Sequence, residues 1–281
     1  MQRIAFIILL LYTSVLSALS VDTWIRINQL GYLPGSVKRA VFLGEDTVKV
    51  QSFSLHQALT DQLVFKSESP EAKGKFYTFC STYVLDFSAY KTPGVYYLKV
   101  GNTISPPVII NKNVYDGTAD FALRYMRQQR CGYNPSLNMT CHEHDGYEVY
   151  GEDPQQHKYI DVTGGWHDAS DYLQYGTTSA NAVFQLLFAW QKNPEAFSDA
   201  FDAAGKPGTN GIPDILDEAK WGLDWLLKMY PENEMLYHQI ADDRDHASFR
   251  LPGEDRVDYG WGPGTGRPVY RATGTPQGLF T

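Results

Sequence analysis

The stretch Asp161-Val-Thr-Gly-Gly-Trp-His-Asp-Ala-Ser-Asp-Tyr172 decides how the rest of the chain is interpreted. It carries two aspartates three residues apart, Asp168 and Asp171, and two glycines, Gly164 and Gly165, that permit a tight turn or a positive φ. Carboxylates at i and i+3 of a helical turn point to the same side, where two like charges are unfavourable unless a function uses them. Glycosidases use such a carboxylate to activate water or to attack a sugar carbon. The structural alternative is an Asx-turn and a helix N-cap, in which both aspartates accept backbone N–H groups.

This pattern closely resembles the first catalytic motif of the family 9 glycoside hydrolases, the cellulase-type enzymes, which reads approximately DVxGGWxDAGDY. Ser170 stands where the family usually has glycine, so it must accept the backbone conformation of that glycine. The resemblance extends from about Val21 to the C-terminus and includes an N-terminal all-β module that often precedes the catalytic domain. It implies inverting hydrolysis of β-1,4-glucans, with Asp171 as general base and Asp168 as its partner in holding the water.

Length and composition set the broad class. The chain has 281 residues, enough for one large or two moderate domains, and 43% of them are apolar, which is ample for a core. A formal net charge of −8 argues against nucleic acid and against an anionic membrane surface as partners. Aromatic residues make up 14% of the chain. Core packing explains most of them, and the surplus is compatible with a sugar ligand.

Residues 1–20 have the pattern of a secretory signal peptide. Arg3 supplies a positive charge, an apolar segment follows from Ile4 to Leu16, and small residues permit cleavage after Ser20. A membrane anchor is the weaker interpretation because the apolar run is short and interrupted, and no later segment is apolar enough to span a bilayer. We therefore expect a secreted protein, extracellular or periplasmic, with no membrane partner.

Residues 21–111 are expected to form an all-β immunoglobulin-like sandwich. Short runs rich in β-branched and aromatic residues recur without helical periodicity, separated by glycine and proline. The runs begin at Trp24 and continue at 39–43, 47–55, 76–87, 94–100 and 108–110. No cluster of chemically active side chains lies among them, so a supporting module is favoured over a sugar-binding module. Cys80, within one of the runs, is expected to be a buried free thiol.

After a linker at 106–113 the apolar periodicity becomes helical, which predicts an all-α domain over 114–281. Helices are expected at about 115–130, at 177–192 and from Pro213 to the residue before Pro231. The expected buried stripes are Phe121, Ala122, Tyr125, Met126 and Gln129; then Ala180, Val183, Phe184, Leu187 and Phe188; then Ile215, Leu216, Ala219, Leu223, Leu226 and Leu227. The family's catalytic domain is an (α/α)6 toroid, a barrel of paired helices, so the resemblance implies that these helices form only its first part.

Two cysteines and two histidines are gathered near the motif. Cys131, Cys141 and His142 lie in a loop rich in Gly, Pro and Asn, and His167 directly precedes Asp168. Two thiolates and two imidazoles make a tetrahedral zinc set, but the Cys-x9-Cys-His spacing is not that of a zinc finger. A Cys131–Cys141 disulfide is equally natural in an exported protein. Some family members that carry the N-terminal module hold a structural zinc with two Cys and two His at matching positions, so the resemblance implies zinc bound by all four residues.

Other polar groups receive structural interpretations. The oxygens of Asn210–Asp214, with Asp217 and Glu218, make calcium conceivable, but helix capping by acids of the first turn is preferred. His144 is a rival metal ligand, although an exposed loop histidine is the commoner case, and the same holds for His157. The glycosylation pattern Asn138-Met-Thr140 is attributed to chance.

The segment Asp242-Asp-Arg-Asp-His246 is followed by an aromatic, Gly-rich loop that contains Trp261. Similar family members have an Asp-His loop bordering the substrate cleft here. The resemblance implies that His246 hydrogen-bonds sugar hydroxyls, that Trp261 stacks on a sugar ring, and that Tyr172, beside the base, also contacts substrate. A loop held together by salt bridges of Arg244 and Arg250 is an equally good interpretation.

Two classes of function follow. The first is a secreted glycoside hydrolase acting on a β-glucan polysaccharide or oligosaccharide, such as cellulose or a related hemicellulose. The second is a non-catalytic carbohydrate-binding protein with the same fold. The family's general acid is a glutamate near the far end of the toroid, and no stretch here resembles its motif. The glutamates in other contexts are Glu218, Glu232, Glu234 and Glu254. We therefore expect a fragment of a longer reading frame, inactive alone and with exposed apolar helix faces.

Overall fold

The computed structural model describes residues 22–153, 156–246, 249–261 and 266–273. The chain divides into two compact units, one ending at Tyr115 and the other beginning at Asp116, and each has its own hydrophobic core. In the described part of the chain, no helix is both long and apolar enough to cross a membrane. The predicted signal peptide at 1–20 lies outside the described residues.

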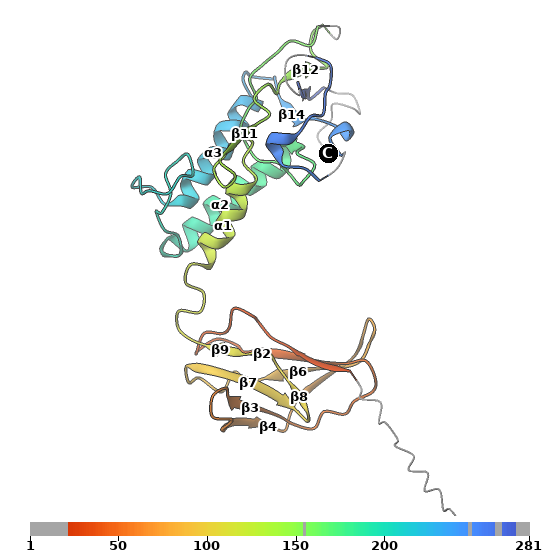
Figure 1. Cartoon of the computed structure of the whole chain (residues 1–281), viewed down its shortest axis with the longest axis vertical. Coiled ribbons are helices and arrows are strands. Elements are labelled where there is room, and N and C mark those ends of the chain that lie inside the picture. The colour runs from red at the N-terminus through yellow and green to blue at the C-terminus, as the bar shows by residue number, and fades with distance from the viewer. Residues whose placement is uncertain (1–21, 154–155, 247–248, 262–265, 274–281) are drawn as a thin grey trace, which may run out of the picture. The chain divides into compact units, whose positions relative to one another are not determined.

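The N-terminal unit consists of two sheets packed face to face (Figure 1). Their antiparallel strands are β1 (Thr23–Arg26), β2 (Arg39–Gly44), β3 (Phe53–Gln57), β4 (Leu63–Ser67), β5 (Glu71–Phe76), β6 (Phe79–Asp86), β7 (Gly94–Val100), β8 (Thr103–Ile104) and β9 (Val108–Ile110). One sheet has the order β1-β2-β6-β5, and the other has the order β4-β3-β7-β8, with β9 also paired to β7. The observed arrangement is the two-layered sandwich that the short apolar runs indicate.

The sandwich is held together by side chains that alternate along each strand. Phe42 from β2, Leu55 from β3, Leu85 from β6 and Leu98 from β7 meet between the sheets and are at most 1% exposed. Strand β5 escaped prediction because all its residues are exposed, so its sequence shows no inward-facing apolar alternation.

The prediction of a buried Cys80 is wrong, because its thiol is exposed. The residues of β6 that pack in the core, Tyr83 and Leu85, lie toward the other end of the strand. Cys80 is the second residue of β6, close to the connection from β5, and that end of the strand is less buried than the following Ser81 and Thr82.

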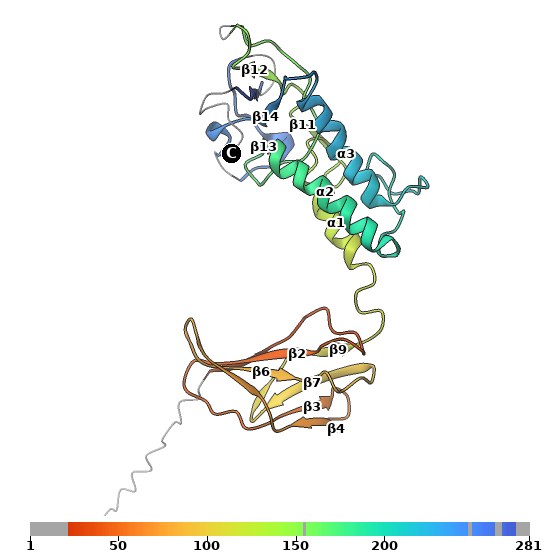
Figure 2. The same cartoon turned by 180° about the vertical axis from the view of Figure 1, so that it is seen from behind.

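The second unit combines helices with small sheets. Helices α1 (Thr118–Gln128), α2 (Gly176–Lys192) and α3 (Asp214–Met229) lie side by side in both views (Figures 1 and 2). A four-stranded sheet has the order β12 (Tyr147–Val149), β15 (Pro268–Arg271), β14 (Tyr237–Ile240) and β13 (Gln174–Tyr175), and a hairpin joins β10 (Gly132–Asn134) to β11 (Met139–Cys141). Short 3-10 turns are η1 (Pro194–Ala196), η2 (Asp243–Asp245) and η3 (Pro252–Glu254). The described part is therefore mixed rather than all-α. The sequence does not indicate these strands, because strands of two to four residues are too short to show a period of two.

The helix positions agree with the predicted ranges to within a few residues, but the predicted buried stripes agree only in part: Val183 of α2 and Ile215 and Ala219 of α3 are buried as predicted. On α1 the buried side chains are Leu123 and Arg127, whereas Phe121 is 73% exposed. On α2 Phe184 is 60% exposed, and on α3 Leu227 is 63% exposed. In the described part of the chain these side chains form an apolar helix surface, while the opposite faces of the helices pack against one another and against the motif.

A second core lies beneath the motif. It joins α3, the four-stranded sheet and the motif itself, and its buried members include Val162, Leu173, Trp225, Ile240 and Val269. Apolar packing against α3 and the four-stranded sheet thus helps to hold the motif in place.

Truncation of the sandwich core tests this architecture. Leu55→Ala removes a side chain that is 0% exposed, so the free energy of unfolding is expected to fall by about 2–5 kcal/mol in urea denaturation. Leu59→Ala, in the adjoining turn, removes a side chain that is 95% exposed and is the matched control, with an expected change within about 0.5 kcal/mol. Equal losses for the two variants would contradict the assignment of Leu55 to the core.

Candidate functional site

The conformation of the motif is set by tryptophans of α3. Trp225 donates its indole N–H to the carbonyl of Val162 at 3.0 Å, and Trp221 donates to the carbonyl of Gly165 at 2.8 Å. Gly164 and Gly165 both have positive φ, at 116° and 68°. A Cβ on Gly165 would lie 2.6 Å from Cδ2 of Trp225, so only glycine fits against the indole ring here.

The two aspartates lie on one turn, which is not helical. The N–H of Asp168 donates to the carbonyl of Leu173 at 2.8 Å and closes the turn, and Tyr172 within it has a φ of 65°. Asp168 is exposed and accepts a hydrogen bond of 2.9 Å from the hydroxyl of Thr178 on α2. From the described residues, neither Asp168 nor Asp171 accepts a backbone N–H, so the capping alternative does not describe their bonds.

Asp171 is half-buried and faces His246. Oδ2 of Asp171 lies 2.8 Å from Nε2 of His246, whose Nδ1 lies 3.3 Å from Oδ1 of Asp243. Oδ1 of Asp171 is shielded from solvent and has no hydrogen-bond partner among the described residues. An unpaired buried acceptor is costly, which marks this oxygen as a candidate functional atom.

A phenol that the sequence did not single out stands next to this turn. Burial raises the pKa of Tyr175, and the negative charges of Asp171, Asp168 and Asp243 raise it further. The Tyr175 hydroxyl therefore lies within the electrostatic influence of all three carboxylates. Tyr175 follows the motif by three residues on β13, but nothing in its local sequence distinguishes it from the many core tyrosines.

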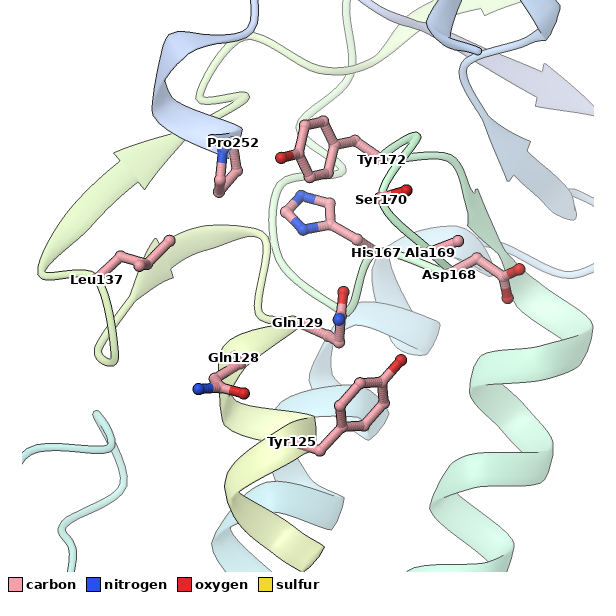
Figure 3. A pocket seen from close by; sticks show the side chains of 10 residues that line it. All are labelled: Tyr125, Gln128, Gln129, Leu137, His167, Asp168, Ala169, Ser170, Tyr172 and Pro252. Atoms are coloured by element: carbon pink, nitrogen blue, oxygen red, sulfur yellow. The ribbon is translucent and has the colours of Figure 1, made fainter. Parts of the chain in front are cut away.

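Two pockets adjoin the turn. The first has a volume of about 430 Å³ and takes Asp168, Ala169 and Ser170 into its wall (Figure 3). Its other lining residues are Tyr125, Gln128, Gln129, Leu137, His167, Tyr172 and Pro252. Figure 3 shows the Asp168 carboxylate directed away from His167, toward the neighbouring helix. The second pocket, about 450 Å³, is lined by Leu173, Tyr175, His238, Gln239, Asp242, Asp243 and Tyr270.

The predicted substrate-binding residues fall in different surroundings. His246 lies at Asp171, as described above. The Trp261 ring stacks on His157 at a centroid distance of 4.1 Å, and Arg244 lies over the same indole. Tyr172 is only 6% exposed and packs on His167 at 4.7 Å, which favours a structural role.

The salt bridges proposed for the Asp-His loop are also present. Arg244 pairs with Asp242, at 2.7 Å, and Arg250 pairs with Asp245 at 2.7 Å and with Asp255 at 2.8 Å. The loop is therefore held by ion pairs and at the same time presents His246 to the aspartate turn. The two interpretations of this segment do not exclude each other.

The four predicted metal ligands form one buried cluster. The donor atoms of Cys131, Cys141, His142 and His167 all lie within 4.8 Å of one another. Cys131 and Cys141 are free thiols, so no disulfide joins them. Burial raises the pKa of the Cys131 thiol to about 11, so metal binding by its thiolate is coupled to loss of the thiol proton. His144, the rival ligand, is exposed and outside the cluster.

The cluster has outer partners that orient its ligands. Nε2 of His142 lies 2.9 Å from a carboxylate oxygen of Asp255, which leaves Nδ1 directed at the cluster, 3.7 Å from the sulfur of Cys131. A carboxylate on the distal nitrogen is the usual support of a metal-binding histidine. The N–H of Cys131 donates to the carbonyl of Gly165 at 2.9 Å, so the cluster is bonded directly to the motif.

The acids considered for calcium have protein partners instead. Asp214 accepts the N–H groups of Ala200 and Phe201, and Asp217 accepts from the side-chain amide of Asn210. Asp214 and Asp217 lie in the first turn of α3, as the preferred interpretation requires, but from the described residues no side chain makes a cap hydrogen bond at Pro213. Glu218 joins Arg130, at 2.8 Å, to the indole of Trp166 in the motif, also at 2.8 Å. These acids tie the start of α3 to its neighbours.

Comparison with known families identifies the chain. Residues 115–279 match the profile described as Glycosyl hydrolase family 9, and residues 20–105 match the Cellulase N-terminal ig-like domain. The first match covers more than half of the chain, so the chain belongs to glycosyl hydrolase family 9, and its sandwich is the Ig-like domain found in cellulases.

Curated relatives and solved structures agree with this family assignment. A cellodextrinase of Butyrivibrio fibrisolvens is 32% identical over 246 residues, which are 83% of this chain and 42% of the relative. A metagenome-derived family 9 endoglucanase superposes with a TM-score of 0.68 at 30% identity, over 89% of this chain and 46% of that one. A Zn-binding triple mutant of another family 9 endoglucanase also superposes with a TM-score of 0.68, at 29% identity, over 85% of this chain and 44% of that one. The chain spans less than half the length of these proteins.

The packing of α3 against the motif leads to a prediction. Gly165→Ala places a methyl group 2.6 Å from Trp225, so the free energy of unfolding is expected to fall by about 2–5 kcal/mol, the cost of positive φ plus overpacking. Gly211→Ala has a comparable φ of 83° but nothing within 4 Å of the new methyl group, so it isolates the backbone cost of about 1–2 kcal/mol. Thermal and urea denaturation of both variants gives the comparison. If Gly165→Ala were no worse than Gly211→Ala, the close contact with Trp225 would be refuted.

Proposed function

We propose that the protein is a secreted glycoside hydrolase that cleaves β-1,4-glucosidic bonds in cellulose or a related β-glucan with inversion of configuration. Membership of glycosyl hydrolase family 9 and the cellodextrinase and endoglucanase relatives support the substrate class. The signal-peptide pattern of residues 1–20 supports secretion. The observation that carries the proposal is the half-buried carboxylate of Asp171, which keeps one oxygen without a partner among the described residues.

In this proposal Asp171 is the general base. Oδ2 is held by His246, and the Asp171 carboxylate accepts the proton from water. Asp168 is on the same turn and supplies a second acceptor for the same water. Removal of the proton makes the water oxygen nucleophilic as it attacks the anomeric carbon from the face opposite the leaving sugar. An acid group then protonates the leaving oxygen, which completes the inverting reaction. His246 and Trp261 are the proposed contacts to the sugar.

We propose zinc as the ion of the buried cluster. Zinc–ligand lengths imply tetrahedral edges of about 3.3 Å between two nitrogens and about 3.6 Å between nitrogen and sulfur. The corresponding distances are 3.3 Å between His167 Nε2 and His142 Nδ1, and 3.7 Å from each histidine to the neighbouring cysteine sulfur, Cys141 and Cys131. Protein ligands fill all four positions, so the ion's role is structural: it joins the β10–β11 hairpin to the motif.

Metal analysis tests the cluster. The purified secreted chain is expected to contain about one zinc, because two thiolates and two imidazoles complete a tetrahedral site. Cys131→Ser should lose the metal and lower the melting temperature, whereas the exposed Cys80→Ser is the matched control and should retain it. Elemental analysis and thiol mass-tagging of denatured protein give the result. Full zinc content in Cys131→Ser, or a Cys131–Cys141 disulfide in the wild type, would refute the site.

The base assignment is tested by substitution in the full-length product of the gene. Asp171→Asn should lower the rate of reducing-sugar release from β-1,4-glucan by about 10²–10⁴-fold, since the amide cannot accept the proton, while circular dichroism stays unchanged. Asp168→Asn should also damage hydrolysis heavily. Asp224→Asn, an exposed aspartate paired with Lys220 on α3, is the control and should behave like wild type.

Two results would count against this assignment. Near-wild-type hydrolysis by Asp171→Asn removes Asp171 as the base. A wild-type protein that binds glucan but releases no reducing sugar favours the non-catalytic carbohydrate-binding alternative.

A further inference from the structure

A fully buried guanidinium in the second unit contacts three of its loops. Arg267, which directly precedes β15 of the four-stranded sheet, is 0% exposed. Its guanidinium donates to both carboxylate oxygens of Asp145, at 2.9 and 2.7 Å, and to Asp245 at 3.0 Å. It also donates to the carbonyl of Tyr172 at 2.6 Å and to the side-chain oxygen of Gln174 at 3.1 Å. All three guanidinium nitrogens therefore have acceptors.

These acceptors adjoin the proposed catalytic pair. Tyr172 directly follows Asp171, and Asp245 directly precedes His246. One nitrogen of Arg267, Nη1, contacts both the Tyr172 carbonyl and the Asp245 carboxylate. The same atom thus fixes the backbone of Tyr172, next to Asp171, and the side chain of Asp245, next to His246. These two neighbours flank the 2.8 Å contact between Asp171 and His246.

The opposite edge of the guanidinium faces the metal cluster. Nη2 lies 3.8 Å from the sulfur of Cys131. Asp145 is in the loop that carries His142, and its N–H donates to the carbonyl of His142 at 3.3 Å. The carbonyl of Arg267 also accepts the N–H groups of Gly146 and Tyr147, so its backbone holds the same loop.

We propose that Arg267 is the positioning residue of this site: it sets the geometry of Asp171 and His246 and couples that geometry to the loop that carries the metal ligands. The inference rests on the proposed function. Arg267 contacts neither the unpaired oxygen of Asp171 nor the imidazole of His246. It acts through Tyr172 and Asp245.

The chemistry of the side chain explains why arginine is needed. Its planar fork offers five N–H donors in fixed directions, and it stays charged when buried. Lysine would keep the charge but has three donors on one nitrogen and cannot bridge Asp145, Asp245 and the Tyr172 carbonyl at the same time. Asp145 and Asp245 are themselves 0% exposed. Among the described residues Asp145 is paired with Arg267, whereas Asp245 shares its charge between Arg267 and Arg250.

A coupling experiment on the zinc-loaded secreted chain tests the proposal without any assay of activity. The probe is the ring signal of His246 in a spectrum of ¹³C-labelled histidine at fixed pH, assigned with His246→Gln. Asp171→Asn is expected to move this signal in the wild-type background, because the two side chains are in contact. In the Arg267→Lys background the same substitution is expected to leave the signal in place, because the pair is no longer held together.

The control background is Arg130→Lys. Arg130 is also a buried arginine paired with a carboxylate, Glu218, but it has no contact with Tyr172 or Asp245. There, Asp171→Asn should move the His246 signal as in wild type. An equal movement of the signal in the Arg267→Lys background would overturn the proposal. If circular dichroism shows that Arg267→Lys does not fold, Asp245→Asn, which preserves the Arg267–Asp145 pair, replaces it as the background. There too, no movement of the His246 signal on Asp171→Asn supports the proposal, and movement as in wild type overturns it.

Kinetics of the full-length product add a second readout. A displacement of about 1 Å in a reacting group costs about 10²-fold in rate, so Arg267→Lys is expected to lower kcat by about that factor with KM unchanged. A proportional rise in KM instead would show that Arg267 acts on substrate binding and would overturn the positioning role. A wild-type protein without hydrolysis would defeat the proposed function alone, since the coupling measurement still decides whether Arg267 sets the Asp171–His246 pair.

Discussion

The second unit depends on the burial of one positive charge among three loops. Arg267 is out of contact with water, and so are the carboxylates of Asp145 and Asp245 that face it. Removing one partner of such a buried pair typically costs about 3–5 kcal/mol, because the remaining charge is left uncompensated. The loop that carries His142, the aspartate turn and the Asp-His loop must therefore form together. The strands next to these loops, β12, β13 and β14, belong to one sheet with β15, and the buried charge bonds the loops themselves to one another.

Apolar packing supplies the complementary constraint. Trp221 and Trp225 of α3 lie against the motif and bond its carbonyls, and they exclude any side chain larger than hydrogen at Gly165. The motif is thus held by indole rings on one side and by the guanidinium on the other. Between these constraints, the turn can keep a carboxylate oxygen of Asp171 without a partner among the described residues, which a less constrained loop would relieve by moving.

The sequence predicts those features that have a local signature. The motif and the helix positions could be found because residue type and spacing carry them. The cluster of Cys131, Cys141, His142 and His167 is predicted only through the family resemblance, since its spacing leaves a disulfide equally open. The inward faces of the helices could be found only in part, since apolar residues such as Phe121 and Phe184 lie on the exposed side in the described part of the chain, while Ile215 is buried as predicted. Arg267 also gives no local signal. Its partners Asp245 and Asp145 lie 22 and 122 residues away, and only the folded chain brings them together.

Asp171 is proposed to activate a water rather than to attack the sugar itself. The most direct test is ¹H NMR of the anomeric protons released in the first minutes of β-1,4-gluco-oligosaccharide hydrolysis by the full-length product. Activation of water by Asp171 predicts that the α-anomer forms first and then mutarotates, because attack from the opposite face inverts the anomeric carbon. Initial release of the β-anomer would show retention through a covalent intermediate and would contradict the assignment of Asp171 as a general base.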